Sequence, residues 1–232
     1  MATIAANIQQ VRGRILQACA AAQRPVESVT LLTVSKTYSA DAVREAVAAG
    51  ERRFGENYVQ EGVDKIDALA DRRADLEWHL IGPLQSNKTR VVAARFDWVH
   101  SVDRLKIAQR LSEQRPADLP PLQVCLQVNT SDEPSKSGLA PAEVRDVAQA
   151  VAALPGVRLR GLMAIPEPVE GFDAQRAVHR RLRMLFDALR ADCLALDTLS
   201  MGMTADLEAA IAEGATLVRV GTAIFGARPR AA

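Results

Sequence analysis

Short apolar runs alternate with helical patterns along most of this sequence, and that alternation limits the fold more than any other feature. Apolar residues at a spacing of three or four, such as Val43 and Val47 or Leu182, Leu185 and Leu189, predict helices between the runs. The runs themselves predict eight strands, at Leu31–Ser35, Arg53–Asn57, Trp78–Gly82, Trp98–Val102, Leu122–Val128, Val157–Ile165, Leu199–Gly202 and Leu217–Phe225.

Eight strand and helix units between Leu31 and Gly226 are close to what a compact eightfold barrel needs. We therefore predict an α/β protein with a single (β/α)8 TIM barrel. The stripe of Ile4, Ile8, Val11 and Ile15 predicts an extra N-terminal helix, so residues 1–25 should pack on the barrel and residues 1–232 should form one domain. An open doubly wound sheet is the competing fold, and it is disfavoured because no glycine-rich dinucleotide fingerprint follows the first strand.

Composition excludes several classes of function. The chain is 48% hydrophobic and 25% charged, and its 29 basic and 28 acidic residues leave a net charge of +1. No basic run indicates a nucleic acid partner, and no stretch of about 18 apolar residues indicates a membrane span. The segment Met1–Asn7 has no charged leader, so we expect a soluble cytoplasmic protein. We also expect a monomer.

The three cysteines, Cys19, Cys125 and Cys193, lie far apart in the sequence. Their spacing indicates neither a disulfide framework nor a metal site, so we expect three buried thiols.

The first and last predicted strands carry the most specific group of residues. Lys36 ends the first strand, and the last strand contains Arg219, Gly221 and Thr222. These strands are neighbours if the barrel closes, which brings together an amine, a fixed cation and a glycine-hydroxyl pair. Such a set meets the needs of a pyridoxal phosphate site, which takes a lysine for the aldehyde, a partner for the ring nitrogen and donors for the phosphate.

A second loop supports a phosphate site. Catalytic and binding groups of barrels lie at the carboxyl ends of the strands, and phosphates commonly dock on the loops after strands seven and eight. Ser200–Thr204 follows the seventh strand, and Gly221 and Thr222 lie in the eighth. Alone, Thr204 could be a helix cap and Gly221 a turn glycine. Together they predict a phosphate cup.

Arg219 alternates with Leu217 and Gly221, so it faces the lumen if they do. A buried arginine needs a ligand or a carboxylate, and Glu56 or Glu77 could supply the carboxylate. Both alternatives stay open at this level. Burial beside Arg219 would also lower the pKa of Lys36 and make its amine more nucleophilic.

Other polar residues are less specific. Asn57 could hydrogen-bond the phenolic oxygen of the cofactor or cap the helix that follows from Tyr58. His79 and His100 show no spaced acidic partner, so they are expected to be core histidines. Lys136 could be a second amine at the rim, although an ordinary loop lysine is the more economical interpretation.

The sequence resembles the YggS-type pyridoxal phosphate homeostasis proteins. Motifs that carry this resemblance occur in order along almost the whole chain, at 33–36, 54–61, 78–82, 84–88, 161–166, 200–206 and 219–226. The resemblance implies a barrel like the N-terminal domain of bacterial alanine racemase, with Lys36 as the internal aldimine and Arg219 facing the pyridine nitrogen. It also implies that Thr204, Gly221 and Thr222 hold the phosphate. The family usually has serine at position 204, and threonine keeps the hydroxyl.

The function that the resemblance implies is reversible binding of pyridoxal 5′-phosphate, which affects vitamin B6 and amino-acid homeostasis. Pyridoxal phosphate enzymes would be its partners, and no robust catalysis is expected. Racemases of this fold take a tyrosine from a second domain, whereas only six residues follow Gly226 here, so we expect no such group. A racemase-like or lyase-like enzyme and a cofactor-free Schiff-base aldolase acting on sugar phosphates are the alternatives.

Overall fold

Eight parallel strands form a closed barrel in the computed structural model, which describes residues 3–131 and 137–226. Each strand pairs with its neighbours in sequence, and β1 pairs with β8 to close the ring. The predicted (β/α)8 barrel is confirmed, and the open doubly wound sheet is wrong. The strands are β1 (Thr30–Val34), β2 (Arg53–Glu56), β3 (Glu77–Leu80), β4 (Trp98–Val102), β5 (Leu122–Gln127), β6 (Val157–Met163), β7 (Thr198–Ser200) and β8 (Leu217–Val220).

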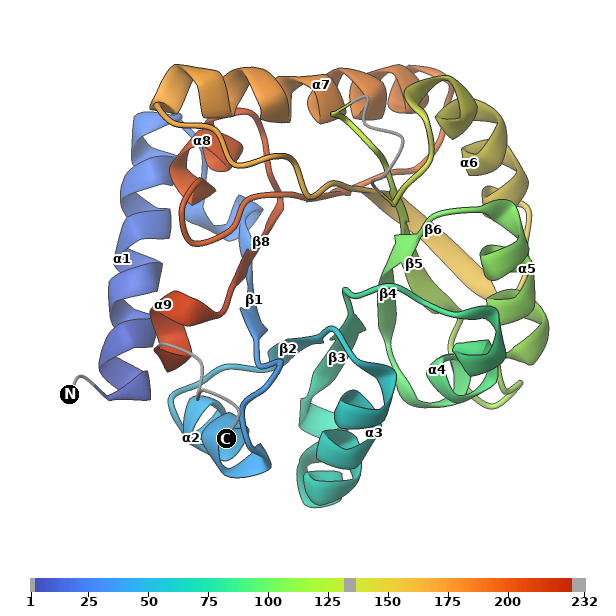
Figure 1. The fold of residues 1–232 in the computed structure, drawn as a ribbon, viewed down its shortest axis with the longest axis horizontal. Coiled ribbons are helices and arrows are strands. Elements are labelled where there is room, and N and C mark those ends of the chain that lie inside the picture. The colour runs from blue at the N-terminus through green and yellow to red at the C-terminus, as the bar shows by residue number, and fades with distance from the viewer. Residues whose placement is uncertain (1–2, 132–136, 227–232) are drawn as a thin grey trace.

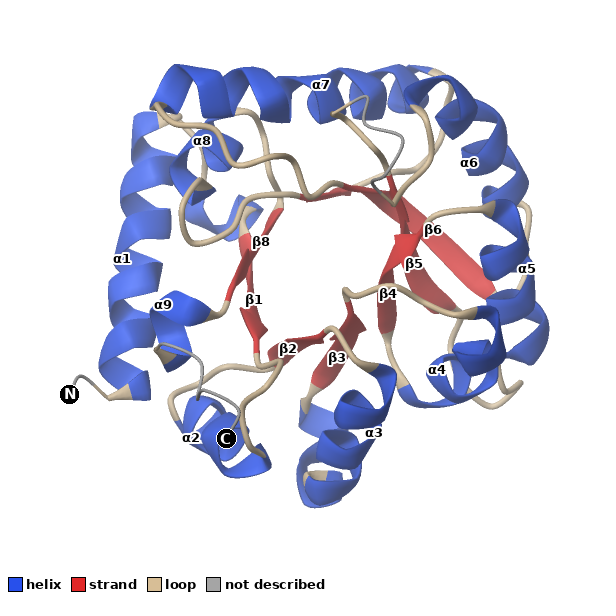
Figure 2. Cartoon of the chain, viewed as in Figure 1, coloured by secondary structure: helices blue, strands red, loops and turns tan. Residues whose placement is uncertain are grey.

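Helices surround the barrel on the outside (Figures 1 and 2). The helix α1, which precedes the first strand, packs against α8 and α9 on the side of the barrel where β1 meets β8. The α-helices are α1 (Ile4–Ala21), α2 (Ala40–Ala48), α3 (Val59–Ala68), α4 (Thr89–Arg95), α5 (Leu105–Gln114), α6 (Val144–Ala152), α7 (Phe172–Ala191), α8 (Leu207–Ala212) and α9 (Thr222–Phe225). Short 3-10 turns lie at Val26–Ser28, Ala70–Asp75, Ser86–Lys88 and Pro141–Glu143.

Apolar packing occurs in two separate places. The main core lies between the helices and the outer face of the sheet, where helical stripes such as Ile107 and Leu111 of α5 are buried. Inside the lumen, Leu32, Ile81 and Leu217 belong to a smaller apolar cluster. A further small cluster of Trp98, Cys125 and Met163 lies beside the buried His79, and buried histidine, serine and arginine side chains make other parts of the lumen polar.

Two sequence predictions are wrong, one about the end of the eighth strand and one about the cysteines. The eighth strand ends at Val220 instead of Phe225, because the backbone N–H groups of Ile224 and Phe225 turn back to the carbonyl oxygen of Gly221 (2.8 and 3.0 Å) and form α9. The prediction of three buried thiols also fails. Cys19 and Cys125 are buried, whereas Cys193 is exposed in a left-handed turn (φ 65°) after α7.

None of the described helices has the length and apolar content that a bilayer span requires.

Candidate functional site

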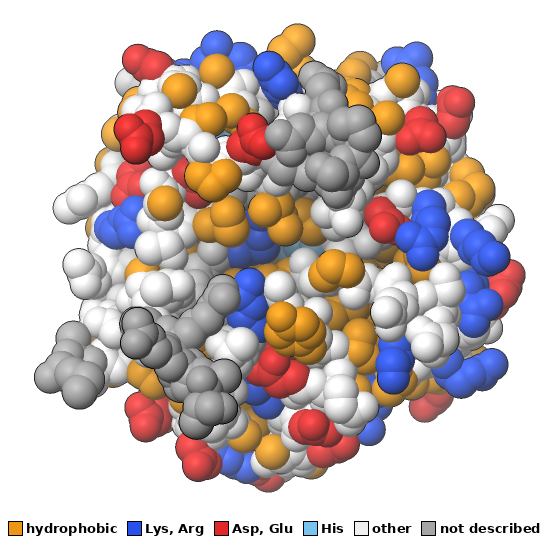
Figure 3. All heavy atoms as spheres, in the orientation of Figure 1, with side chains coloured by type: hydrophobic (Ala, Val, Ile, Leu, Met, Phe, Trp, Pro, Cys, Tyr) orange, Lys and Arg blue, Asp and Glu red, His pale blue; other side chains and the backbone are white. Residues whose placement is uncertain are grey.

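A cavity of about 270 Å³ opens at the carboxyl ends of the strands. All six residues that the sequence predicted for a cofactor site line it. The complete lining is Val34, Lys36, Tyr38, Asn57, Ile81, Ile165, Met203, Thr204, Ala205, Arg219, Gly221 and Thr222. The face drawn in Figure 3 is hollowed near its middle, where basic side chains lie among hydrophobic ones. A cavity of this size suits a small ligand with one ring.

The pairing of the first and last strands creates the core of the site. Leu32 of β1 lies opposite Arg219 of β8, so the turn that holds Lys36 and the turn at Gly221 emerge side by side. Gly221 allows this approach, because a Cβ atom at this position would lie 2.8 Å from the backbone oxygen of Val34.

Arg219 forms the base of the cavity and is 4% exposed. Its Nη1 donates to the backbone oxygen of Ser200 (2.6 Å) and to Ser200 Oγ (2.7 Å), and its Nη2 donates to the backbone oxygen of Ala164 (2.8 Å). Within residues 3–131 and 137–226 no carboxylate forms a salt bridge with it, so pairing with Glu56 or Glu77 is wrong. Burial lowers the pKa of Arg219 to about 10, which still leaves it positively charged at neutral pH.

The turn that carries Lys36 is strained and held by hydrogen bonds. Thr37 has a φ of 69°, a left-handed conformation that is rare for a β-branched residue. Its N–H donates to Glu61 Oε1 (2.5 Å), and Lys65 Nζ donates to the backbone oxygen of Ser35 (2.6 Å). The hydroxyl of Tyr38 donates to the backbone oxygen of Gly226 (2.6 Å), which ties the turn to the end of α9. Contacts on both sides of Lys36 therefore fix its backbone.

Lys65 is a buried lysine whose three donors are all used. Besides Ser35, its Nζ donates to Glu56 Oε1 (2.8 Å) and Glu61 Oε1 (2.6 Å). Glu56 is fully buried, and its Oε1 also accepts the hydroxyl of Ser35 (2.5 Å). Burial raises the pKa of Glu56 to about 7, although Lys65 and Ser35 act to lower it. Lys65 therefore supports the turn and does not line the cavity.

The loop between β7 and α8 holds Thr204 at the cavity. Arg14 Nη2 donates to the backbone oxygen of Thr204 (2.8 Å) and ties the loop to α1. The carboxylate of Asp206 accepts the N–H of Met203 (2.6 Å) and contacts His179 Nε2 (2.9 Å). Asp206, not Thr204, is the N-cap position of α8, so the cap alternative for Thr204 is wrong.

Asn57 follows β2 and faces the cavity. The helix α3 begins at Val59 with Tyr58 as its N-cap position, so Asn57 does not cap it. Gly82 packs tightly against the backbone of Asn57, since a Cβ atom there would overlap the carbonyl group of Asn57.

Both lumen histidines are fully buried, which confirms that His79 and His100 are core residues. The expectation that they have no acidic partner is wrong for His79, whose Nε2 lies 2.9 Å from Glu77 Oε1. Two residues apart on one strand, these side chains share a face, so the sequence carried the signal. Lys136 lies outside the described residues.

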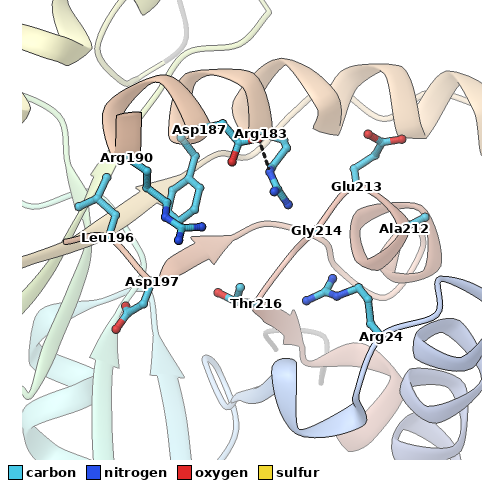
Figure 4. Close-up of a pocket in the computed structure, with 11 residues that line it drawn as sticks. Arg24, Arg183, Asp187, Arg190, Leu196, Asp197, Ala212, Glu213, Gly214 and Thr216 are labelled. Atoms are coloured by element: carbon cyan, nitrogen blue, oxygen red, sulfur yellow. Dashed lines mark hydrogen bonds and ion pairs between the residues drawn. The ribbon is translucent and has the colours of Figure 1, made fainter. Parts of the chain in front are cut away.

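Larger pockets exist at the opposite end of the barrel, and several of their charged residues form ion pairs. One of about 690 Å³ lies near the start of β8 and is shown in Figure 4. In it, Arg183 bonds to Asp187 (2.7 Å), Asp197 is held by Arg160, and Glu213 is held by two arginines of α7. The bonds from Arg176 and Arg180 to Glu213 join α7 to the end of α8, which is typical of a structural region.

Comparison with known proteins decides the family. The chain matches the alanine racemase N-terminal domain family over residues 2–229. It is 64% identical over 228 residues to a protein of Pseudomonas aeruginosa named pyridoxal phosphate homeostasis protein, covering 98% of this chain and 97% of that protein. It is 56% identical over 229 residues to the Escherichia coli protein of the same name, covering 98% of each. The chain belongs to the pyridoxal phosphate homeostasis protein family.

Solved structures agree with this assignment. A structure of PipY from Synechococcus elongatus, described as having pyridoxal phosphate (PLP) bound, is 40% identical with a TM-score of 0.84 and covers 97% of this chain and all of that one (100%). An alanine racemase from Corynebacterium glutamicum is 18% identical with a TM-score of 0.73, covering 98% of this chain and 62% of that chain, and it shares the fold. The resemblance of the sequence to pyridoxal phosphate homeostasis proteins is thus confirmed.

Sequence reasoning missed part of the lining and its support. Tyr38, Ile165 and Met203 line the cavity, but single apolar or aromatic residues after a strand carry no specific signal. Lys65 had a usable signal, because it follows Glu61 by four residues on a predicted helix and could pair with it.

Proposed function

We propose that this protein binds pyridoxal 5′-phosphate reversibly in the cavity at the carboxyl ends of the strands, and that it buffers the cofactor or delivers it to enzymes that use it. The observation that carries the proposal is that Lys36, at the end of β1, and Arg219, Gly221 and Thr222, at the end of β8, line one cavity. Relatives named pyridoxal phosphate homeostasis proteins support it.

The cavity fits the chemistry of this ligand. When bound, pyridoxal phosphate supplies an aldehyde that condenses reversibly with a primary amine. Of the five lysines in the chain, Lys36 lines the cavity, whereas Lys65 uses its three donors in buried hydrogen bonds. We therefore assign the amine to Lys36.

The remaining predicted residues contact different parts of the ligand in our proposal. Arg219 is a buried cation at the base of the cavity and faces the ring nitrogen in our proposal. Thr204, Gly221 and Thr222 hold the phosphate. Asn57 donates to the phenolic oxygen. The protein acts as a monomer and a carrier, with no robust catalysis of its own.

Reduction and peptide mapping test the proposal. The purified protein should be yellow after incubation with pyridoxal phosphate, and borohydride should fix the ligand on Lys36. Lys36→Ala should remove the adduct while circular dichroism stays unchanged, and Lys106→Ala, an exposed lysine on α5, should behave as the wild type. An adduct only on Lys88, Lys106 or Lys136 would refute the assignment of the amine. Absence of any binding would refute the function.

A further inference from the structure

A chain of hydrogen bonds runs through the barrel lumen from the cavity to its opposite end. Arg219 Nη1 lies 2.7 Å from Ser200 Oγ, and Ser200 Oγ lies 2.8 Å from His100 Nδ1. His100 Nε2 lies 2.8 Å from His79 Nδ1, and His79 Nε2 lies 2.9 Å from Glu77 Oε1. We call these five residues the lumen relay. Four different strands contribute to it.

The two ends of the lumen relay fix the position of every proton inside it. A guanidinium group only donates, and an ionised carboxylate only accepts. Ser200 therefore accepts from Arg219 and donates its own proton to His100 Nδ1. Each imidazole must then carry its proton on Nε2, so that His100 donates to His79 and His79 donates to Glu77.

Burial agrees with neutral rings between charged ends. His79 and His100 are both fully buried, and burial lowers the pKa of each. For His100 the charges of His79 and Arg219 would lower the pKa further. Glu77 lies at the end of the lumen opposite the ligand cavity, where it lines a solvent-accessible pocket with Arg53. Burial alone would raise its pKa, but the hydrogen bond from His79 and the charge of Arg53 lower it, so Glu77 is ionised at neutral pH.

The orientation of the lumen relay matters for Arg219. Ser200, His100 and His79 each turn a lone pair toward Arg219 and a proton toward Glu77. Their dipoles therefore add, and the negative ends face the buried cation. Among the described residues Arg219 has no carboxylate within salt-bridge distance. The carbonyl oxygens of Ser200 and Ala164, the more distant charge of Asp206 and these dipoles together stabilise its charge. The dipoles also keep Ser200 Oγ as an acceptor, which orients the guanidinium group.

We propose that His79 and His100 are positioning residues for Arg219, and that the lumen relay couples the cation at the ligand cavity to Glu77 at the other end of the barrel. This proposal rests on the proposed function only for the identity of the ligand next to Arg219. Its proton arrangement is a property of the protein without ligand, and it can be measured there.

The first test uses nuclear magnetic resonance of the 15N-labelled imidazoles in the ligand-free protein. The chain has three histidines, so His79→Gln and His100→Gln assign the signals. We expect both lumen rings to be neutral with the proton on Nε2 from pH 6 to pH 8. A proton on Nδ1 of either ring, or a charged ring at pH 7, would overturn the lumen relay whatever the protein binds.

The second test measures pyridoxal phosphate affinity in variants of the relay. His100→Gln can still accept from Ser200 and donate to His79, so its affinity should stay within about threefold of the wild type. His100→Leu removes both bonds, and its affinity should fall about tenfold, with a shift in the absorption of the bound ligand. Affinity in His100→Leu equal to that of the wild type would refute the positioning role while leaving the proposed function intact.

Glu77→Ala provides a variant at the solvent end, where the Glu77 side chain is 40% exposed. It should give His79 a mixture of tautomers and weaken ligand binding a few-fold. Glu27→Ala is the matched control, because it removes an exposed carboxylate just before β1, at the same end of the barrel, outside the lumen relay. Equal behaviour of the two variants would contradict the coupling. Failure of the wild type to bind pyridoxal phosphate would instead count against the proposed function, and the tautomers would still test the relay.

Discussion

Lys65 and Glu56 form a buried salt bridge, with Nζ 2.8 Å from Oε1, directly behind the turn that carries Lys36. The lysine side chain is 6% exposed and the glutamate side chain is 0% exposed. Because the same Nζ also donates to the backbone oxygen of Ser35, the residue before Lys36, this pair connects the buried interior to the cavity wall. The stability of the pair and the placement of Lys36 should therefore change together.

Lys65→Met should destabilise the protein by about 3–5 kcal/mol, because it leaves Glu56 buried without its cation. Urea unfolding followed by circular dichroism gives the free energy of unfolding. Lys106→Met, on the exposed face of α5, is the control and should change it by less than about 0.5 kcal/mol. The double variant Lys65→Met/Glu56→Gln should recover part of the loss. Equal stability of Lys65→Met and the control would contradict the pairing.

The stability that depends on Glu56 should fall as pH rises. Burial raises its pKa from 4.5 to about 7 in the folded protein, so the folded state binds the proton more tightly than the unfolded chain. That contribution is complete below about pH 4.5 and is lost as pH passes 7, and it amounts to about 3 kcal/mol. Unfolding free energies of the wild type and Glu56→Gln, measured from pH 4 to pH 8, should show the difference shrinking. A constant difference would argue against this titration.

Thr204→Val should weaken pyridoxal phosphate much more than pyridoxal. Removing one hydrogen bond to a charged group costs roughly 1.5–3 kcal/mol, which is about a tenfold to hundredfold loss of affinity. Thr204→Ser keeps the hydroxyl and should bind both ligands as the wild type does. Fluorescence titration with each ligand gives the affinities, and equal losses for both ligands would show that Thr204 does not touch the phosphate.

The protein should not racemise alanine faster than free pyridoxal phosphate does. Arg219 stays protonated with a pKa of about 10, so it cannot give the ring nitrogen a proton, and the ring draws electrons less strongly than one beside a carboxylate. Chiral analysis of D-alanine formed from L-alanine measures the rate. Turnover well above the free cofactor, abolished in Lys36→Ala, would favour an enzyme over a carrier.

One of the three cysteines should react with a maleimide in the folded protein. Cys193 is exposed, whereas burial raises the pKa of the Cys125 thiol to about 12 and also raises that of the buried Cys19 thiol. Mass spectrometry should find a single label on Cys193 under native conditions and three labels after unfolding in urea. Native labelling of Cys125 would show that the barrel interior opens, since Cys125 packs there against Trp98 and Met163.

Much of this protein was predictable from its sequence, because the features involved are local or follow from chain order. Alternating apolar runs and helical stripes determined the eight units of the barrel. Once the barrel closes, Lys36 after the first strand and Arg219 in the last must lie close together, and the loops at 200–204 and 221–222 must share that end. The binding roles of these residues remain predictions for the experiments above.

Only the tertiary structure decided which residues of the interior hydrogen-bond to one another. Apolar composition does not distinguish a short strand from a helical turn, so α9 at Thr222–Phe225 depended on the hydrogen bonds to Gly221. His100 meets Ser200 across 100 residues of sequence, and Lys65 reaches back from α3 to Ser35. Such contacts depend on the register of strands around the closed barrel and on which rotamers fit the lumen. No periodicity along the chain encodes them.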